Sequence, residues 1–515
     1  MSKGKLLAVC VVWLLLLGVG VLAWKLIFVP SRQDEQLRQQ GEQQQQAEQQ
    51  RLARLKKGGS VSRYRHQVSF SLDSFSGYAV LRSEEFKRQL GSRNIRLDLH
   101  DDGADYLARI KALKSGDADM AVFTIDALVK VCSQINELPA TIVAFIDETV
   151  GADAIVAYKQ AVPDLDALNR AETRFVLTPN SPSETLARAV MSRFALDQLS
   201  AQPFEEVNDA QAVLDRYRQG RASDPVAYVL WEPFVSQILE NPETHVVVDS
   251  SGFPSTIVDV IVAADDFWIK NPDVVKGLVE AYLRSLHRYR DRDAMVQLVT
   301  DDATKSGSPL SAEQAGKLVD GIWWKNTQEN LAHMGFLPGK PLPHVEDMIA
   351  NIIDVLATTG GVQNDPTQGN ASYLYTSEVF AELQSFHPGD VPEQIRKIRL
   401  PALDEEQWQR LTPVGTARVP NLVFAPATDR LTPSSQLVLD ELAVRLSTTR
   451  FYLLIQGNAS RRGDPEKNKE LAARRAKAAE QYLNTKGVDG NRIRSFGAEP
   501  SGARSVSFVL QQMPY

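Results

Sequence analysis

At 515 residues the chain is too long for one ordinary hydrophobic core, so we expect two or three domains. The formal net charge of −7 gives no reason to expect a nucleic-acid partner, because a phosphate-binding surface needs clustered Lys and Arg. The two cysteines are Cys10, in the first apolar run, and Cys132, so neither an internal disulfide nor a cysteine-based metal site is expected.

An apolar run near the start of the chain predicts a membrane anchor. Residues 6–24 are nearly all apolar and would form a helix about 29 Å long, enough to cross a hydrocarbon core of about 30 Å. A cleavable signal peptide is the alternative, but the apolar run continues past the candidate cleavage point. A lipoprotein is disfavoured because Cys10 precedes most of the run. We therefore expect residues 1–30 to be an uncleaved anchor, and Lys3 and Lys5 favour a cytoplasmic amino terminus.

Residues 31–64 follow as a Gln-rich stalk. The segment has scattered charge and almost no apolar residues before Leu52, so it cannot bury a core. It is either a solvated helix or a disordered spacer, and a coiled coil is disfavoured because its heptad a and d positions would not be apolar. We expect the stalk to hold the following domains away from the membrane.

Strand-like and helical patterns alternate through residues 65–385, which predicts an α/β domain with a mostly parallel sheet. Two halves are expected, about 65–150 and 170–260, followed by a helical tail. The first expected elements are strands at 66–72, 95–99 and 121–124, and a helix at 104–114 that Gly116 ends.

Loops at the carboxyl ends of these strands supply the candidate binding residues, because ligands bind there in open parallel sheets. The candidates are Ser76, Gly77, Tyr78, Asp102, Thr124, Asp126, Asp153, Ser181, Ser183, Trp231, Glu232 and Asp259. Each acidic candidate is either a cleft residue or a helix cap or surface charge, and Trp231 is either a wall of the site or a packing residue. Several carboxylates in one narrow cleft would favour a cationic ligand over nitrate or sulfate, because like charges repel.

The segment Ser181 to Glu184 follows an expected strand and has the pattern of a capping box, with Pro182 at the first helical position. It is either a well-formed helix start or a site where free amides and the hydroxyls of Ser181 and Ser183 contact a ligand anion. The carboxylate of Glu184 would oppose that anion.

Five segments, in this order, resemble the periplasmic solute-binding proteins of ABC importers, most of all the nitrate/sulfonate/taurine and pyrimidine-precursor group. They are residues 76–78, 101–123, 147–157, 230–235 and 257–283. The resemblance implies a type II fold of two α/β lobes joined by crossing strands, with a ligand clamped between them, and it makes an ABC permease a candidate partner.

No enzyme activity, cofactor or metal is expected from the motifs. Some pyrimidine synthases of thiamine biosynthesis share the fold that the resemblance implies, but they use a Cys-rich motif that Cys132 alone cannot supply. The seven histidines lack metal-ligand spacing, and no nucleophile elbow or phosphate-binding loop is present.

After a Pro-rich, charged linker at 386–414, residues 415–515 predict a small α/β sandwich. Strands are expected at 418–424, 451–456, 493–496 and 505–510, and helices from Thr432-Pro433 and over 466–483. The buried side of the first helix is expected to hold Leu437, Leu439, Leu442, Val444 and Leu446.

The run Gly457-Asn458-Ala459-Ser460, with Asn468 and Arg475 after it, resembles the C-terminal family of OmpA. The resemblance implies contact with peptidoglycan, in which the family's Asp and Arg hold the amino and carboxylate groups of diaminopimelate. Arg475 can hold a carboxylate through two bonds, but Ser460 stands at the Asp position and cannot counter an ammonium charge. Ser460, Asn468 and Arg475 are the candidate peptidoglycan-binding residues, and a packing or partner module is the alternative.

The expected protein is thus a single-pass inner-membrane protein with its bulk in the periplasm. It would capture a small polar solute for import or sensing, and its OmpA-like domain would contact the cell wall or a partner. The alternative is a ligand-free structural link between the inner membrane and peptidoglycan.

Overall fold

The computed structural model describes residues 64–338, 342–389, 391–396, 400–447, 449–458, 462–498 and 506–513. The predicted anchor and the Gln-rich stalk, up to residue 63, lie outside these ranges. Within these ranges, no helix combines the length and the apolar character needed to span a bilayer.

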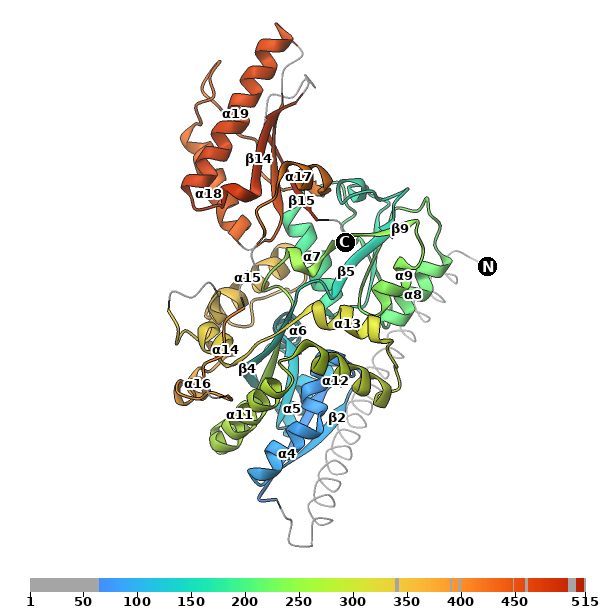
Figure 1. Ribbon diagram of the computed structural model, residues 1–515, viewed down its shortest axis with the longest axis vertical. Helices are drawn as coiled ribbons and strands as arrows, with labels where there is room; N and C mark the ends of the chain where they lie inside the picture. Colours follow the sequence, from blue (N-terminus) through green and yellow to red (C-terminus); the bar gives the residue numbers. More distant parts are fainter. Residues whose placement is uncertain are drawn as a thin grey trace, which may run out of the picture. The chain divides into compact units, whose positions relative to one another are not determined.

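The first lobe is built around a six-stranded sheet with the order β11-β4-β10-β3-β1-β2 (Figure 1). Its strands are β1 (His66–Leu72), β2 (Ile95–Asp101), β3 (Met120–Thr124), β4 (Ala140–Thr149), β10 (Val258–Ala264) and β11 (Ile322–Trp324). β1 runs parallel to β2 and β3, whereas β10 runs antiparallel to β3 and β4. Every residue of β3 and β10 is buried, as expected for sheet strands covered on both faces.

Helices cover this sheet, and their ends follow the local sequence. They are α3 (Ala79–Arg82), α4 (Glu84–Ser92), α5 (Tyr106–Ser115), α6 (Ile125–Ile135), α10 (Asp265–Lys270), α11 (Pro272–Arg288), α12 (Arg292–Lys305), α13 (Ala312–Asp320), α14 (Thr327–His333), α15 (Val345–Thr358) and α16 (Glu378–Glu382). In α5, the Asp105 carboxylate accepts a hydrogen bond from the Ala108 amide at the amino end. Gly116 ends the helix with a φ of 75°, as the sequence predicts.

The second lobe has a five-stranded sheet with the order β7-β6-β8-β5-β9. Its strands are β5 (Asp153–Tyr158), β6 (Arg174–Leu177), β7 (Phe204–Glu206), β8 (Val226–Trp231) and β9 (Thr244–Asp249). Its helices are α7 (Pro182–Arg193), α8 (Ala210–Gln219) and α9 (Phe234–Leu239). β6 is parallel to β7 and β8, and β5 is antiparallel to β8 and β9.

The two sheets repeat one topology. In each, the antiparallel strand separates two strands that run parallel to each other, and it follows directly after the chain has crossed from the other lobe. The first crossing joins β4 to β5 through residues 149–153, and the second joins β9 to β10 through residues 249–258. Two α/β lobes joined by two crossings are the architecture that the sequence resemblance implies.

The C-terminal domain has a four-stranded sheet with the order β12-β15-β13-β14. Its strands are β12 (Thr412–Thr416), β13 (Tyr452–Gly457), β14 (Ile493–Gly497) and β15 (Val506–Gln512). Its helices are α17 (Glu405–Arg410), α18 (Pro433–Ser447) and α19 (Pro465–Thr485). α19 packs against β13 and β14, and α18 lies beside α19 (Figure 1). The α/β sandwich is therefore confirmed.

Two details of the C-terminal prediction are wrong. The strand expected at 418–424 lies instead at 412–416, because Pro420 lacks the amide that a strand would use to pair. In α18, Leu439, Leu442 and Leu446 are buried as expected, but Leu437 and Val444 are 66% and 67% exposed. A turn of 3.6 residues places this second pair on the opposite face of the helix.

The start of β13 also contacts the second lobe. The Phe451 ring packs edge-to-face against the rings of Phe253 and Phe194, with centroids 5.4 and 6.0 Å away. The Arg450 amide donates a 3.0 Å hydrogen bond to the Gly252 carbonyl. The second crossing segment is therefore covered by the C-terminal domain.

Candidate functional site

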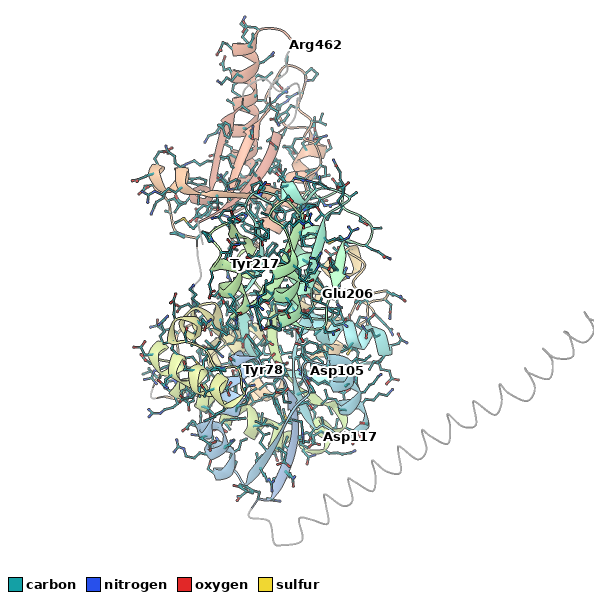
Figure 2. The ribbon with its side chains drawn as sticks, turned by 90° about the vertical axis from the view of Figure 1, so that its right-hand side faces the viewer. Tyr78, Asp105, Asp117, Glu206, Tyr217 and Arg462 are labelled. Carbon is teal, nitrogen blue, oxygen red and sulfur yellow. The ribbon has the colours of Figure 1, made fainter. Side chains whose placement is uncertain are left out.

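A cavity of about 670 Å³ lies where the two lobes meet. It is lined by residues at the strand ends of both lobes, and Figure 2 labels two that the first lobe contributes, Tyr78 and Asp105. The volume falls within the range of about 300–1,000 Å³ that is usual for small-molecule sites. Native side chains thus leave the gap between the lobes open.

The charged side chains in the cavity lining are all acidic. None of the lining residues is Lys, Arg or His. The carboxylates come from both lobes and are Asp73, Asp105, Asp153, Asp209, Glu232 and Asp259. Because like charges concentrated in one cavity repel a further negative charge, this lining favours a cation.

Aromatic rings form much of the remaining wall. Phe75 and Tyr78 of the first lobe meet edge-to-face with centroids 5.3 Å apart, and Trp231 and Phe234 of the second lobe do so at 6.4 Å. Tyr106 is the fifth ring. Aromatic faces attract cations through the ring quadrupole and also bury apolar surface.

Asp153 is the acidic residue with which the second lobe begins. It is the first residue of β5, directly after the first crossing, and it is 3% exposed. Burial raises the pKa of Asp153 to about 7, because the charged form loses its hydration. The nearby carboxylates of Asp126 and Asp147 push it in the same direction. A cation placed beside Asp153 would favour its ionised form.

Asp147 and Asp259 form a buried carboxyl pair at the inner end of the cavity. They face each other across β4 and β10 and are 0% and 2% exposed. Asp259 lines the cavity and accepts a hydrogen bond from the Tyr78 hydroxyl, whereas Asp147 lies behind it. Burial raises the pKa of both carboxyl groups, and the negative charge of Asp147 raises that of Asp259 further.

Three threonines present buried polar atoms to the cavity. The residues Thr124, Thr149 and Thr178 line it, and the hydroxyls of Thr124 and Thr149 lie beside the carboxyl groups of Asp126 and Asp153. No hydrogen-bond partner reaches the Thr178 hydroxyl from the described part of the chain. Since a buried hydroxyl without a partner costs about 1–3 kcal/mol, a bound solute or water would satisfy this group.

The structure places eight of the twelve predicted binding residues in the cavity lining. They are Ser76, Tyr78, Thr124, Asp153, Ser181, Trp231, Glu232 and Asp259. Gly77 and Asp102 lie outside the lining. The Gly77 carbonyl accepts a 2.9 Å hydrogen bond from the Trp324 indole, and Asp102 accepts one of 2.7 Å from Nε of Arg109.

Asp126 and Ser183 also lie outside the lining, buried behind it. Asp126 is fully buried and accepts a hydrogen bond from the Thr185 hydroxyl, and burial raises its pKa. The Ser183 hydroxyl is buried, and no described residue forms a hydrogen bond with it. Both side chains lie where α6 and α7 meet.

The capping box predicted at the start of α7 does not form. The Ser181 hydroxyl donates a 2.6 Å hydrogen bond to the Thr178 carbonyl instead of capping the helix. Glu184 forms a salt bridge with Lys130 of α6 and a 2.7 Å hydrogen bond with Nε of Arg188. Glu184 also accepts a 2.7 Å hydrogen bond from the Asn180 amide at the start of the helix, and the two cations neutralise its charge there.

Sequence reasoning missed the other three acidic residues of the lining, Asp73, Asp105 and Asp209. It also missed Tyr106, which lines the cavity, and Asp147, which backs it. Asp209 is visible as a helix cap after a strand. Asp147 is harder to find, because only the pairing of β4 with β10 shows that it meets Asp259. Across the described ranges, no group of three or more His, Cys, Asp or Glu is placed to hold a metal ion.

The candidate wall-binding residues lie on α19 and before it. Nε of Arg475 donates a 2.9 Å hydrogen bond to the Thr428 carbonyl, and its guanidinium lies 4.9 Å from the centre of the Phe424 ring. Nδ2 of Asn468 donates a 2.8 Å hydrogen bond to the Arg462 carbonyl. Ser460 lies outside the described residues.

Comparison with known proteins identifies the C-terminal domain. Residues 423–506 match the OmpA family. Over 68 residues, the chain is 44% identical to the peptidoglycan-associated lipoprotein of Rhizobium meliloti (strain 1021). The match covers 13% of this chain and 39% of that protein, so the chain spans well under half of the curated relative's length. The resemblance of this domain to OmpA is confirmed.

Solved structures similar to the chain include periplasmic sulfonate-binding and nitrate-binding proteins. A putative sulfonate-binding protein of Methylobacillus flagellatus KT is 12% identical, with a TM-score of 0.47 over 65% of this chain and 99% of its own. The aliphatic sulphonate binding protein of Escherichia coli is 14% identical, with a TM-score of 0.45 over 66% and 98%. The nitrate-binding protein of Synechocystis PCC 6803 is 12% identical, with a TM-score of 0.40 over 62% and 89%.

Proposed function

We propose that the chain is a cell-envelope protein that captures a small cationic solute between its two lobes, for import or sensing. The observation that carries the proposal is the charge of the cavity: its lining holds six acidic side chains, of which Asp73 is already paired with Arg109 behind it, and no cationic side chain. If the solute is imported, an ABC permease is the partner that we expect.

The proposed solute is an organic monocation with a flat apolar body. An ammonium or amidinium group would form charge-assisted hydrogen bonds with Asp153 and Asp259, which are each worth about 1.5–3 kcal/mol. The rings of Tyr106 and Trp231 would contact the apolar body and the charge. The solved structures named above are sulfonate-binding and nitrate-binding proteins. We propose a different class of ligand for this cavity because its lining offers those anions no cation.

A matched set of ligands tests the proposal on the full-length chain. Benzylamine, benzyl alcohol and benzenesulfonate share a ring and differ in charge, and choline, agmatine, taurine and nitrate extend the series. We expect only the cations to raise the melting temperature. At one hundred times the dissociation constant, the stabilisation should be about 2.7 kcal/mol. Binding of nitrate or the sulfonates, with no response to any cation, would refute the proposed ligand class.

Two variants test whether the response to cations depends on the carboxylates of the cavity or only on the overall charge of the protein. Asp153→Asn removes a buried carboxylate from the lining and should reduce the response to cations. Asp266→Asn removes a carboxylate that is 87% exposed, and it lies beyond the end of β10 opposite to Asp259. The second variant should respond as the unchanged chain does.

We further propose that the chain is held at the inner membrane by residues 1–30 and contacts peptidoglycan through the OmpA domain. The match to the OmpA family, the similarity to a peptidoglycan-associated lipoprotein and the presence of Arg475 support the wall contact. A pull-down of the full-length chain on peptidoglycan should be competed by free diaminopimelate, and Arg475→Ala should reduce retention. If neither free diaminopimelate nor Arg475→Ala reduces retention on peptidoglycan, the proposed role of Arg475 is wrong.

The ligand-free structural link is the second candidate function. The open cavity and the buried Thr178 hydroxyl, which has no hydrogen-bond partner among the described residues, favour a receptor over this alternative. A chain that binds peptidoglycan and responds to no member of the ligand series would support the structural role instead.

A further inference from the structure

The carboxyl pair of Asp147 and Asp259 has a geometry that forces it to hold a proton. The two residues are direct partners in the antiparallel pairing of β4 with β10, so their side chains leave the sheet on the same face. Their carboxyl groups are close enough to share a hydrogen bond. Two buried carboxylates in contact cannot both be ionised, so one proton stays between them.

No cation relieves this pair. Among the described residues, no N–H or hydroxyl group reaches either oxygen of Asp147, so the carboxyl group of Asp259 is its hydrogen-bonding neighbour. Nζ of Lys325 lies near Asp147, but it donates a 2.6 Å hydrogen bond to Glu148. The Tyr78 hydroxyl is the donor to Asp259. The titratable groups around the pair are Tyr78, Tyr106, Tyr282, Asp73, Asp153, Glu148 and Lys325.

Only one member of the pair faces the cavity. Asp259 lines it, next to Tyr78 and within the same lining as Asp153, while Asp147 is sealed behind. A cation that enters the cavity therefore reaches Asp259 first. Its positive charge can replace the charge of the shared proton without changing the net charge of the site.

We infer that capture of the cationic solute expels the proton shared by Asp147 and Asp259, so that the cleft exchanges one cation for another. The inference rests on the proposed function. The pair passes from one negative charge to two, the proton leaves to solvent, and the incoming ammonium group balances the second carboxylate. Below the pH at which the pair loses its proton unaided, the exchange by itself should lower affinity about tenfold per pH unit, in addition to any effect of Asp153.

Titration calorimetry on the full-length chain tests the exchange with benzylamine as the probe. The heat of binding is measured at pH 6.5 in phosphate, HEPES and Tris. Because the ionisation enthalpies of these buffers differ, the difference in heat between them gives the number of protons released. Asp153 adds a release of its own, because its pKa is about 7. Asp147→Asn, which leaves the lining of the cavity unchanged, should reduce the count by about one proton per bound amine.

The results separate this inference from the proposed function. If benzylamine and the other cations fail to bind at any pH, the proposed function is wrong. If benzylamine binds with the same heat in all three buffers, or if Asp147→Asn releases as many protons as the unchanged chain, only the exchange is wrong.

A second measurement, infrared spectroscopy, first examines the chain without ligand. A buried protonated carboxyl group gives its own carbonyl band in the infrared spectrum. The free chain at neutral pH should show this band, Asp259→Asn should weaken it, and benzylamine should weaken it in the unchanged chain. Asp266→Asn should leave it intact. Absence of the band in the free chain would overturn the inference, whether or not Asp147→Asn folds.

Discussion

Two sets of buried carboxylates lie around the cleft, and they differ in whether the protein supplies a cation. In the paired set, Glu184 contacts Lys130 and Arg188, and Glu148 contacts Lys325. In the unpaired set, Asp147, Asp153 and Asp259 have neither an Arg nor a Lys within ion-pair distance among the described residues. Burying a charge without a partner is costly, and three such groups beside one cavity are what support the proposal that the cavity receives a cation.

The largest expected effect comes from breaking the paired set. Glu184→Gln would leave the buried cations Lys130 and Arg188 without their carboxylate. We expect the free energy of unfolding to fall by about 3–5 kcal/mol, because uncompensated buried charge is strongly destabilising. Urea unfolding followed by tryptophan fluorescence measures the change. A loss below about 1 kcal/mol would show that the paired set is not needed for stability.

In the unpaired set, the charged form of the carboxyl group should destabilise the folded chain, whereas in the paired set it stabilises the folded chain. The pKa of Asp153 is about 7 in the folded protein and about 3.9 in an unfolded chain, so between these values the folded state holds a proton that the unfolded state lacks. Stability therefore decreases as the pH rises through this window. For the ligand-free chain we expect a loss of about 2–3 kcal/mol from Asp153 between pH 5 and pH 8.

Urea unfolding across this pH range checks the sign. In Asp153→Asn the decrease should be smaller, because no carboxyl group remains at this position to lose its proton. A decrease of the same size in the variant would assign the effect to other groups.

A smaller effect is expected for a carboxylate that lines the same cavity but is exposed. The Asp209 side chain is exposed and accepts a 2.8 Å hydrogen bond from the Ala212 amide as the cap of α8. Asp209→Asn keeps a capping side chain and removes a charge that water already screens. We expect benzylamine affinity to fall by less than about fivefold, since exposed charges interact by about 1 kcal/mol or less. Calorimetry beside Asp153→Asn makes the comparison, and equal losses would contradict it.

The smallest effect is expected for a paired carboxylate on the surface. Glu84 forms a 2.8 Å salt bridge with Lys87, and its side chain is 78% exposed. Glu84→Gln should leave the urea midpoint unchanged, because solvent screens such pairs. A shift as large as that of Glu184→Gln would mean that burial is not what separates the two sets.

Much of the fold follows from local sequence. Alternating strand and helix patterns predict β1, β2, β3 and the helix that Gly116 ends, because each depends on residues within one element. The errors arise where one element depends on a distant one. Glu184 accepts a hydrogen bond from the Asn180 amide and pairs with Lys130, a residue 54 positions away, and no local pattern predicts that second contact.

The candidate site shows the same division. Loops at strand ends place eight predicted residues around the cavity, since that rule needs only the order of strands and helices. Asp102 lies outside the lining because it accepts hydrogen bonds from the guanidinium of Arg109, 7 positions later in the chain. Asp147 was missed because its importance depends on its alignment with Asp259, which is more than one hundred residues later in the chain.

The two crossings also fix the order in which the lobes can fold. All five strands of the second lobe are continuous in the chain, from residue 153 to residue 249, whereas the first lobe needs β10 to join β3 to β4. About 110 residues separate the end of β4 from the start of β10, which is roughly 5–20 s of synthesis at 5–20 residues per second. During this interval β3 and β4 have unpaired edges, which are templates for aggregation. The inserted lobe can finish early, and the lobe that surrounds it must wait for its central strand.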